Sequence, residues 1–253
     1  DACAIAMDVS SPEKLCAITG TWSINEYISE KPVPADGSTL NSLFCIPGYY
    51  LIEESSPTSA GNLEWVIDNF FKEERDAASV CGEPVYDYIN QAVKSAPVSD
   101  IIFLPFLYGT NYPGCNGACF AGITGDSSRA DIVRAVYEGV AFSHLSHIEK
   151  LLDRRERPEA VRIAGGVVNS EVWLQIFADI IGIPLEVVNT KELGALGCAM
   201  AAVCAGQYKD YADAAGHMVK VKAVIQPELQ MHKIYMEKYR RYKALANFYS
   251  QIK

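Results

Sequence analysis

Two segments of the chain share one order of features: an apolar strand, a glycine-containing turn and an amphipathic helix. The first is GACFAGITGDSSRADIVRAVYE at residues 117–138, and the second is AGGVVNSEVWLQIFADIIGIP at residues 164–184. In such a unit the turn presents backbone N–H groups, and the helix adds the positive end of its dipole. Two units of this kind are typical of a nucleotide site in which the backbone does the holding.

Hydrophobic periodicity predicts the other elements. LCAITGTWSINEYIS at residues 15–29 alternates around Gly20-Thr21, as a β-hairpin does, and a short helix precedes it. We expect further helices over 62–74, 84–95, 129–153, 170–181, 191–206 and the last thirty residues. We expect further strands within 43–54, over 101–109 with an interruption at Pro105, and over 160–166 and 184–189. Strands followed by strand–helix alternation predict an α/β layered domain.

Composition and charge exclude some classes of partner. The chain has 253 residues, of which 49% are hydrophobic and 21% charged, as in a soluble globular protein with a sizeable core. Its formal net charge of -9 argues against nucleic-acid binding, which needs a basic surface. An anionic nucleotide is still compatible with this charge, because oriented backbone dipoles and Mg²⁺ act locally.

The cysteines indicate a reducing compartment. Most of the eight cysteines lie in apolar or small-residue runs, and no CxxC pair is present. We therefore expect free thiols, no zinc site and a cytoplasmic location. We find no apolar run long enough to span a bilayer and no signal peptide, so no membrane partner is expected.

The first unit also resembles the C-terminal signature of the FGGY family of carbohydrate kinases. The matching residues are Ala118, Phe120, Gly122, Ile123, Asp131, Ile132, Ala135, Val136, Tyr137 and Glu138. The resemblance runs from end to end and implies an actin-like (ribonuclease H-like) ATPase domain, a mixed sheet flanked by helices. Residues 1–253 would then be the C-terminal nucleotide-binding domain of a two-domain sugar kinase. The N-terminal domain of the same polypeptide would be absent, as a chain that opens with Asp1 rather than Met suggests.

The resemblance implies that Asp1 is the catalytic base. The family places its catalytic carboxylate in an Asp-small dipeptide some way before a Gly-Thr hairpin, and DACAIAMD followed by Gly20-Thr21 has that order. A fixed carboxylate accepts the proton of the attacking sugar hydroxyl and aims its oxygen. The simpler interpretation of Asp1 is a helix N-cap or a frayed terminus. Asp8, the competing carboxylate, is interpreted as a helix-end or surface group.

The family also uses its Gly-Thr hairpin to contact nucleotide phosphates, which assigns Gly20 and Thr21 to ATP binding. Glycine lets the chain approach a phosphate closely, and the threonine hydroxyl adds a donor. Many members continue with Ser or Gly, whereas this chain has Trp22. The alternative interpretation is an ordinary hairpin turn without a role in binding.

The second unit resembles the family's adenosine motif. Gly165 and Gly166 would let adenine lie against the backbone, while Asn169 or Ser170 caps the next helix and offers a side-chain contact. Gly122 is expected to line the same cleft. In isolation, a Gly-Gly pair equally describes a plain strand–helix connection.

Three further residues on the helix predicted at 129–153 carry charge or metal-binding potential. Glu138 lies on an apolar face, and we expect it to be buried, paired and structural. His144 and His147 have a spacing compatible with a metal, but no carboxylate or cysteine completes a ligand set. Structural roles are therefore expected for both histidines.

The resemblance thus implies ATP-dependent phosphorylation of a hydroxyl of a ketose, polyol or keto-acid sugar, with ATP and Mg²⁺ as cofactors. EESSPTSAGNLEW at 53–65 resembles the branch that phosphorylates L-xylulose and related keto sugars or keto-acids. We expect the isolated chain to be inactive, and the family allows a homodimer. The alternative is a non-catalytic actin-like nucleotide-binding or sensor module. A dinucleotide-dependent oxidoreductase is disfavoured because the chain lacks GxGxxG.

Overall fold

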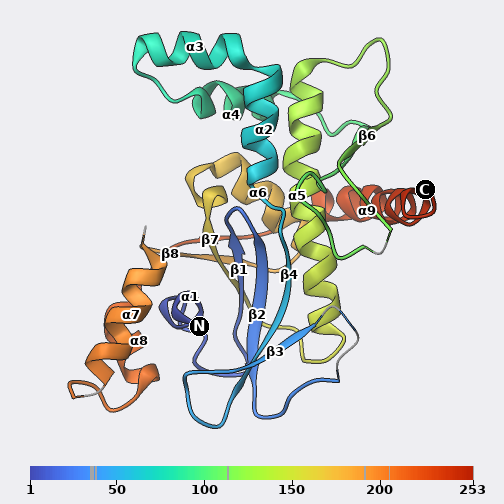
Figure 1. Cartoon of the computed structure of the whole chain (residues 1–253). Helices are drawn as coiled ribbons and strands as arrows, with labels where there is room; N and C mark the ends of the chain where they lie inside the picture. Colours follow the sequence, from blue (N-terminus) through green and yellow to red (C-terminus); the bar gives the residue numbers. More distant parts are fainter. Residues whose placement is uncertain (35–36, 38, 113, 191, 205, 253) are drawn as a thin grey trace.

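A seven-stranded mixed sheet forms the centre of the structure, a computed structural model that describes residues 1–252 except 35, 36, 38, 113, 191 and 205 (Figure 1). The strand order is β3-β4-β2-β1-β7-β8-β9, in which β1, β7 and β8 run parallel and the other pairs are antiparallel. The strands are β1 (Leu15–Thr19), β2 (Ser23–Ser29), β3 (Leu40–Leu43), β4 (Tyr50–Ser56), β7 (Val161–Gly165), β8 (Leu185–Val188) and β9 (Val221–Ile225).

Alternation along the strands gives the sheet two apolar faces, because successive side chains of a strand point to opposite sides. Leu15 and Ala17 of β1 belong to one hydrophobic cluster, and Cys16 between them belongs to the other. In β7, Ile163 and Ala164 divide in the same way. Both faces therefore need a covering layer of helices.

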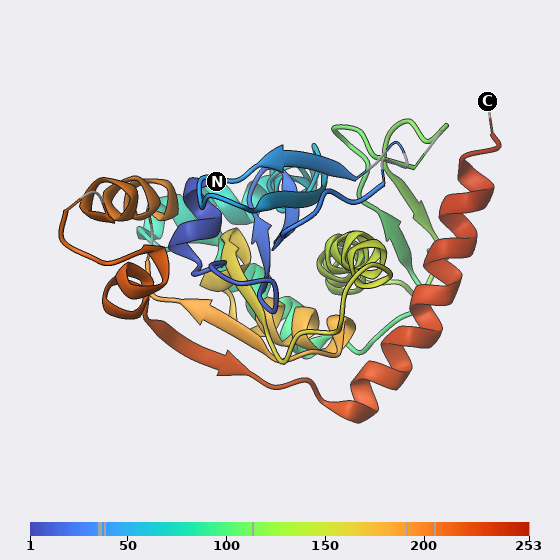
Figure 2. The same cartoon turned by 90° about the horizontal axis from the view of Figure 1, so that it is seen from below.

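The helices form these layers, which separate clearly in the view of Figure 2. On one face lie α1 (Ala2–Ala6), α7 (Leu193–Cys204) and α8 (Tyr211–Met218). The other face carries α5 (Arg129–Leu152) and α6 (Glu171–Ile181). Helices α2 (Gly61–Phe70) and α4 (Val85–Ser95) pack against α5 beyond the end of the sheet, with α3 (Lys72–Cys81) beside them (Figure 1). Beyond α5 lie α9 (Leu229–Tyr249) and a small sheet of β5 (Ile102–Leu104) and β6 (Cys119–Ala121). No helix in the described residues is long and apolar enough to cross a membrane.

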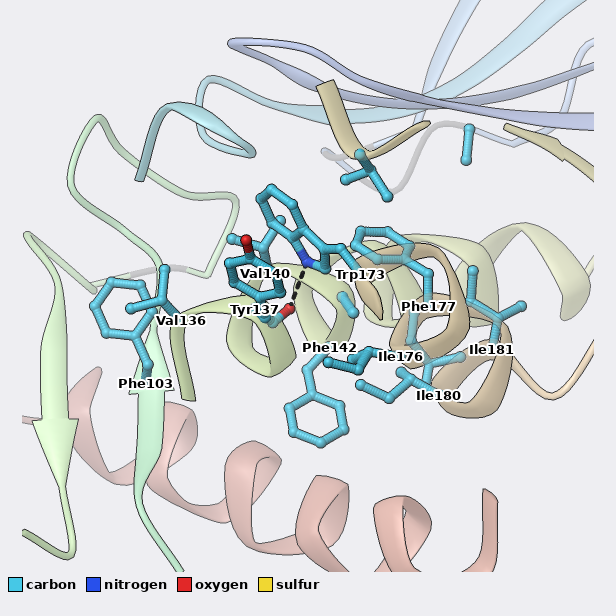
Figure 3. Close-up of a cluster of buried hydrophobic side chains, with 14 of the residues drawn as sticks. Phe103, Val136, Tyr137, Val140, Phe142, Trp173, Ile176, Phe177, Ile180 and Ile181 are labelled. Carbon is cyan, nitrogen blue, oxygen red and sulfur yellow. Dashed lines mark hydrogen bonds between the residues drawn. The ribbon is translucent and has the colours of Figure 1, made fainter. Parts of the chain in front are cut away.

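Helix α5 is the centre of the larger core. Tyr137 stacks on Trp173 of α6 with ring centroids 4.3 Å apart, and the Trp173 indole N–H donates to the Tyr137 carbonyl at 3.0 Å (Figure 3). Glu138 is buried, as expected, and its carboxylate pairs with Arg134 at 2.9 Å and with Lys238 of α9 at 2.5 Å. These contacts fasten α5 to the elements on both of its sides.

The structure confirms most of the predicted elements and corrects others. The helix expected over 62–74 breaks at Phe71, whose backbone leaves the helical region (φ -130°, ψ 32°). Its buried ring lies 4.3 Å beneath the Arg129 guanidinium. The strand expected over 101–109 ends at Leu104, because Pro105 has no N–H for the ladder. Sequence patterning assigned nothing to α8 or to the start of β9, and it wrongly placed Val224 and Ile225 of β9 in the terminal helix, which begins at Leu229. Residues 191 and 205 of the helix predicted at 191–206 lie outside the described part.

Candidate functional site

The tip of the β1–β2 hairpin lies against the turn that follows β7. Thr19 pairs with Gly165 in the sheet, and its hydroxyl donates to the Ala164 carbonyl at 2.8 Å and accepts from the Val167 N–H at 3.3 Å. Gly165 has φ +100°, and a Cβ added to it would lie 2.5 Å from the carbonyl carbon and oxygen of Thr19. Backbone therefore touches backbone here, which only glycine permits.

A third turn joins these two. The Ala60 N–H, just before α2, donates to the Gly20 carbonyl at 3.1 Å. A Cβ on Gly166 would lie 3.5 Å from the Ala60 Cβ. We call residues 19–22, 59–61 and 164–167 the three-turn cluster. It lies at the carboxyl ends of the parallel strands β1 and β7, where open α/β sheets bind their ligands.

The three-turn cluster offers backbone donors. In the described part of the chain, the N–H groups of Thr21, Trp22 and Gly61 have no hydrogen-bond acceptor. Helix α2 has no side-chain N-cap, so its positive end is left uncovered at Gly61. Thr21 and Trp22 are exposed. This combination of free peptide N–H groups and a helix N-terminus suits an anion.

Asn169 and Ser170 lead from the turn after β7 into α6. Asn169 ends η1 (Gly166–Asn169) and is exposed. Ser170 is buried, caps α6 by accepting from the Trp173 N–H at 3.1 Å, and donates to Asn90 Oδ1 at 2.6 Å. Asn90, on α4, also accepts from the Tyr137 hydroxyl at 2.9 Å. Sequence reasoning missed Asn90, which no local motif marks.

Asp1 precedes α1 on the opposite face of the sheet. Its side chain is exposed and makes no capping hydrogen bond, so the N-cap interpretation finds no support in its contacts. A Cβ on Gly197, in α7, would lie 1.9 Å from the Ala2 carbonyl oxygen. At the other end of α1, Asp8 pairs with Lys14 at 2.5 Å and with Arg162, near the start of β7, at 2.9 Å. Asp8 is therefore a structural carboxylate, as predicted.

Gly122 has different neighbours. It follows β6 with φ +85°, and an added Cβ would lie 2.9 Å from the Asp100 carbonyl oxygen, beside the small sheet. None of its close contacts belongs to the three-turn cluster. Its part in nucleotide binding stays a prediction.

One buried carboxyl lies under α1. Glu26 of β2 is buried, and the Cys16 thiol donates to its Oε1 at 3.6 Å. Burial raises its pKa to about 7. The described residues contain no group of three or more His, Cys, Asp or Glu side chains able to hold a metal ion.

Sequence reasoning also missed residues 59–61, which it used as part of the segment 53–65 that resembles the L-xylulose branch of the family. Residues 50–56 form β4, paired with β2 and β3, and the turn after it reaches the Gly20 hairpin. The available signal was Gly61, which follows a run of turn-forming residues and opens a predicted helix. A glycine at a helix start is compatible with a close approach of backbone and ligand.

Comparison with known proteins decides the family. The family model described as "FGGY family of carbohydrate kinases, C-terminal domain" matches residues 15–206 of the chain. The chain belongs to the FGGY family of carbohydrate kinases. The L-xylulose/3-keto-L-gulonate kinase of Escherichia coli K12 is 33% identical to this FGGY chain over 99% of the chain and 50% of the relative. A probable L-xylulose kinase of Haemophilus influenzae is 34% identical over 94% and 47%, respectively.

Solved structures share the fold of this FGGY chain. A ligand-bound xylulose kinase from Lactobacillus acidophilus has a TM-score of 0.87 at 20% identity, over 99% of this chain and 50% of that one. Plasmodium falciparum glycerol kinase with ADP has a TM-score of 0.80 at 20% identity, over 100% and 50%. The predicted actin-like ATPase fold is thus confirmed. The chain spans about half the length of the curated relatives it matches.

Proposed function

We propose that the chain is the C-terminal, nucleotide-binding domain of an ATP-dependent kinase that phosphorylates a hydroxyl of a keto sugar, polyol or keto-acid sugar. One observation carries the proposal: three turns distant in sequence meet at the carboxyl edge of the sheet with unpaired N–H groups, in a chain of the FGGY family. The three turns are joined by the Ala60–Gly20 hydrogen bond, by the Thr19 hydroxyl and by the close backbone contact at Gly165. Contacts of this kind hold donors in place and lower the ordering cost of binding a ligand.

The ATP phosphates would be held by the three-turn cluster. Its donors are the N–H groups of Thr21, Trp22 and Gly61, with the Thr21 hydroxyl beside them and Gly20 giving close access. Trp22, 51% exposed, replaces the small residue common at this place in the family but leaves its backbone N–H available. The donor set therefore fits a phosphate group.

The adenosine would lie along the turn after β7. Gly166 is exposed beside Ala60, and Asn169 is exposed one step before α6, so both are accessible to a base or ribose. Ser170 would act through Asn90, which it contacts. We also assign Gly122 to nucleotide binding, because it belongs to the family signature; a substitution at Gly122 is described in the Discussion.

Asp1 would be the general base. Asp1 directly precedes α1, which packs against α7 where Gly197 lies close to the Ala2 carbonyl oxygen. Asp1 is exposed and has no side-chain partner that would compete for the proton. In line with the γ-phosphate, this carboxylate would accept the proton of the attacking sugar hydroxyl.

Mg²⁺ would enter with the nucleotide. The lack of a ready-made acidic cluster in the described residues fits Mg²⁺, which proteins commonly bind through substrate phosphates, waters and one or two carboxylates. When bound, the ion neutralises charge on the transferring phosphoryl group.

The relatives suggest the substrate class. Two are described as acting on L-xylulose, and one of these also on 3-keto-L-gulonate. We propose a substrate of that keto-sugar class, read mainly by an N-terminal domain of the same polypeptide. Cytoplasmic location is also proposed, since the eight cysteines are all free. A homodimer stays a prediction that light scattering would check.

Turnover of the full-length polypeptide tests the role of Asp1. Asp1→Asn is expected to lower sugar-dependent ADP release about a thousandfold, because it removes the base, while the Kd for ATP stays nearly unchanged. Asp8→Asn is the matched control, expected to lower stability and keep turnover. If Asp1→Asn still consumes ATP at the wild-type rate when sugar is present, the catalytic assignment fails.

Substrate class and domain requirement need separate measurements. ADP release by the full-length enzyme, screened against ketoses, aldonates and polyols, is expected to be highest with a keto sugar. The chain alone is expected to bind ATP weakly and to phosphorylate none of them, since it would lack the other half of the cleft. Full turnover by the isolated chain would contradict the two-domain proposal.

A further inference from the structure

His144 lies at the centre of α5 and is completely buried. Its ring Nε2 is 2.8 Å from the Ser59 hydroxyl, and its Nδ1 is 2.9 Å from Asn25 Oδ1 and 3.2 Å from the Ser23 hydroxyl. The ring also meets Phe177 of α6 edge-on, with centroids 5.4 Å apart. One imidazole thus contacts three elements that come from distant parts of the sequence.

The hydrogen-bond network assigns the tautomer. The Asn25 amide nitrogen donates to the Ser23 hydroxyl at 3.2 Å and to the Glu54 carbonyl at 3.3 Å, so Asn25 Oδ1 faces His144 as an acceptor. His144 Nδ1 must then carry the hydrogen, and Nε2 accepts from Ser59. Burial, with the nearby His147, lowers the pKa of His144 to about 3, so the ring is neutral at working pH.

The two serines that His144 contacts flank the donors of the three-turn cluster. Ser23 follows Trp22 directly and begins β2. Ser59 is followed by Ala60, whose N–H donates to the Gly20 carbonyl, and then by Gly61. Through its contacts with Ser23 and Ser59, His144 therefore links the segment that carries the Thr21 and Trp22 N–H groups to the segment that carries the Gly61 N–H group.

We propose that His144 is a positioning residue that sets the spacing between the hairpin tip and the start of α2, and thereby the fit of the nucleotide phosphates. The inference rests on the proposed function. His144 touches no substrate; it acts through Ser59 and Ser23. A shift of either segment would separate donors that must converge on one phosphate group.

His147 provides an internal comparison one turn along the same helix. It is also buried, and it contacts the Ser56 hydroxyl at 3.2 Å and the Glu54 carboxylate at 3.4 Å. Both partners belong to β4, and neither lies in the three-turn cluster. Ser56 and Ser59 are each 1% exposed and each bonds to one histidine of α5, so they form a matched pair.

The experiment measures Kd for ATP and for adenosine by calorimetry on the full-length polypeptide, with thermal melts to confirm folding. Ser59→Ala is expected to weaken ATP binding about tenfold, or about 1.4 kcal/mol, and to change the Kd for adenosine less than about twofold. Ser56→Ala is expected to change neither Kd by more than about twofold, because its partner His147 lies outside the cluster.

Two substitutions at His144 test whether the side chain must be long enough to contact Ser59, since both introduce a polar amide. His144→Gln can place an acceptor where Nε2 lies, so ATP affinity is expected to stay within about threefold of the wild type. His144→Asn is too short to reach Ser59 and is expected to behave like Ser59→Ala. If His144→Asn does not fold, Ser59→Ala decides the question alone.

The outcomes distinguish the two proposals. If the wild type binds ATP and Ser59→Ala weakens adenosine as much as ATP, or Ser56→Ala weakens ATP as much as Ser59→Ala, then His144 is an ordinary core residue and only this inference fails. If the wild-type polypeptide does not bind ATP at all, the proposed function fails and this inference fails with it.

Discussion

Gly165 and Gly122 both lie where a strand ends, and both have a positive φ, but they belong to the surroundings of two different sheets. Gly165 ends β7, and its neighbour is the Thr19 backbone at the carboxyl edge of the central sheet. Gly122 follows β6, and its neighbour is the Asp100 carbonyl beside the two-stranded sheet. The same local pattern thus occurs in two surroundings, and the strand that each unit pairs with decides what its glycine touches.

The largest expected difference comes from the two glycines themselves. Gly165→Ala puts a methyl group 2.5 Å from Thr19 backbone atoms at φ +100°, so we expect a loss of about 3 kcal/mol or more and no measurable ATP binding. Gly122→Ala meets one carbonyl oxygen at 2.9 Å; a loss of about 2 kcal/mol and a smaller loss of ATP affinity are expected. Urea unfolding and calorimetry measure both. Unchanged ATP binding in Gly122→Ala would remove Gly122 from the site.

A second difference concerns the acidic residue buried on each unit's helix. Glu138 of α5 is paired with Arg134 and Lys238, whereas Asp179 of α6 accepts from the Glu228 N–H and the Gln175 amide. Glu138→Gln is therefore expected to cost about 3 kcal/mol, because it leaves buried cations unpaired. Asp179→Asn should cost about 1 kcal/mol in the same urea titration. Equal costs would mean that the ion network does not hold α5.

The two helices should contribute differently to the pH dependence of folding stability, because α5 carries buried histidines and α6 carries no histidine. The pKa of His144 is lowered to about 3, so below pH 6.5 the unfolded chain binds a proton that the folded chain does not. Folding stability therefore falls as the pH falls, by about 2 kcal/mol for this residue at pH 5. His144→Gln should lack that part of the loss when unfolding is compared at pH 7.5 and pH 5. An identical loss in both proteins would contradict the assignment of a neutral ring.

The smallest expected difference is between the helix caps. Ser128 caps α5 in an exposed capping box with Asp131, and Ser170 caps α6 while bonding to Asn90. Each serine-to-alanine change is expected to cost about 1 kcal/mol of stability. Only Ser170→Ala should also weaken ATP binding, by a few-fold, since Asn90 Oδ1 would keep the Tyr137 hydroxyl but lose the Ser170 hydroxyl. Weaker ATP binding in Ser128→Ala would place the first unit in the site as well.

Sequence patterns predicted what depends on neighbouring residues. The Gly20 hairpin, the strand that ends at Gly165 and a helix cap at Asn169 or Ser170 were each predicted from a few consecutive residues. The structure has all three, with Ser170 as the cap. Family resemblance added the actin-like fold. The buried, paired state of Glu138 also followed from its apolar helix face.

Contacts between distant segments could not be predicted in this way. The Ala60–Gly20 hydrogen bond joins residues forty positions apart, and no local signal marks it. Phe71 interrupts a helical pattern because its ring is buried under Arg129, which comes from another helix. The partners of His144 likewise come from β2 and from the turn before α2. Such details follow only from the assembled fold.

Peptide groups supply the donors at Thr21, Trp22 and Gly61, and every residue type except proline has the same N–H. Replacing Trp22 by another residue would therefore leave the binding chemistry intact, whereas adding a single methyl group to Gly165 would not. The side chain at position 22 can therefore vary during evolution, whereas position 165 must stay glycine, because the Thr19 backbone lies where a Cβ would be. A search for distant relatives should therefore give more weight to a glycine at the position of Gly165 than to the residue type at the position of Trp22.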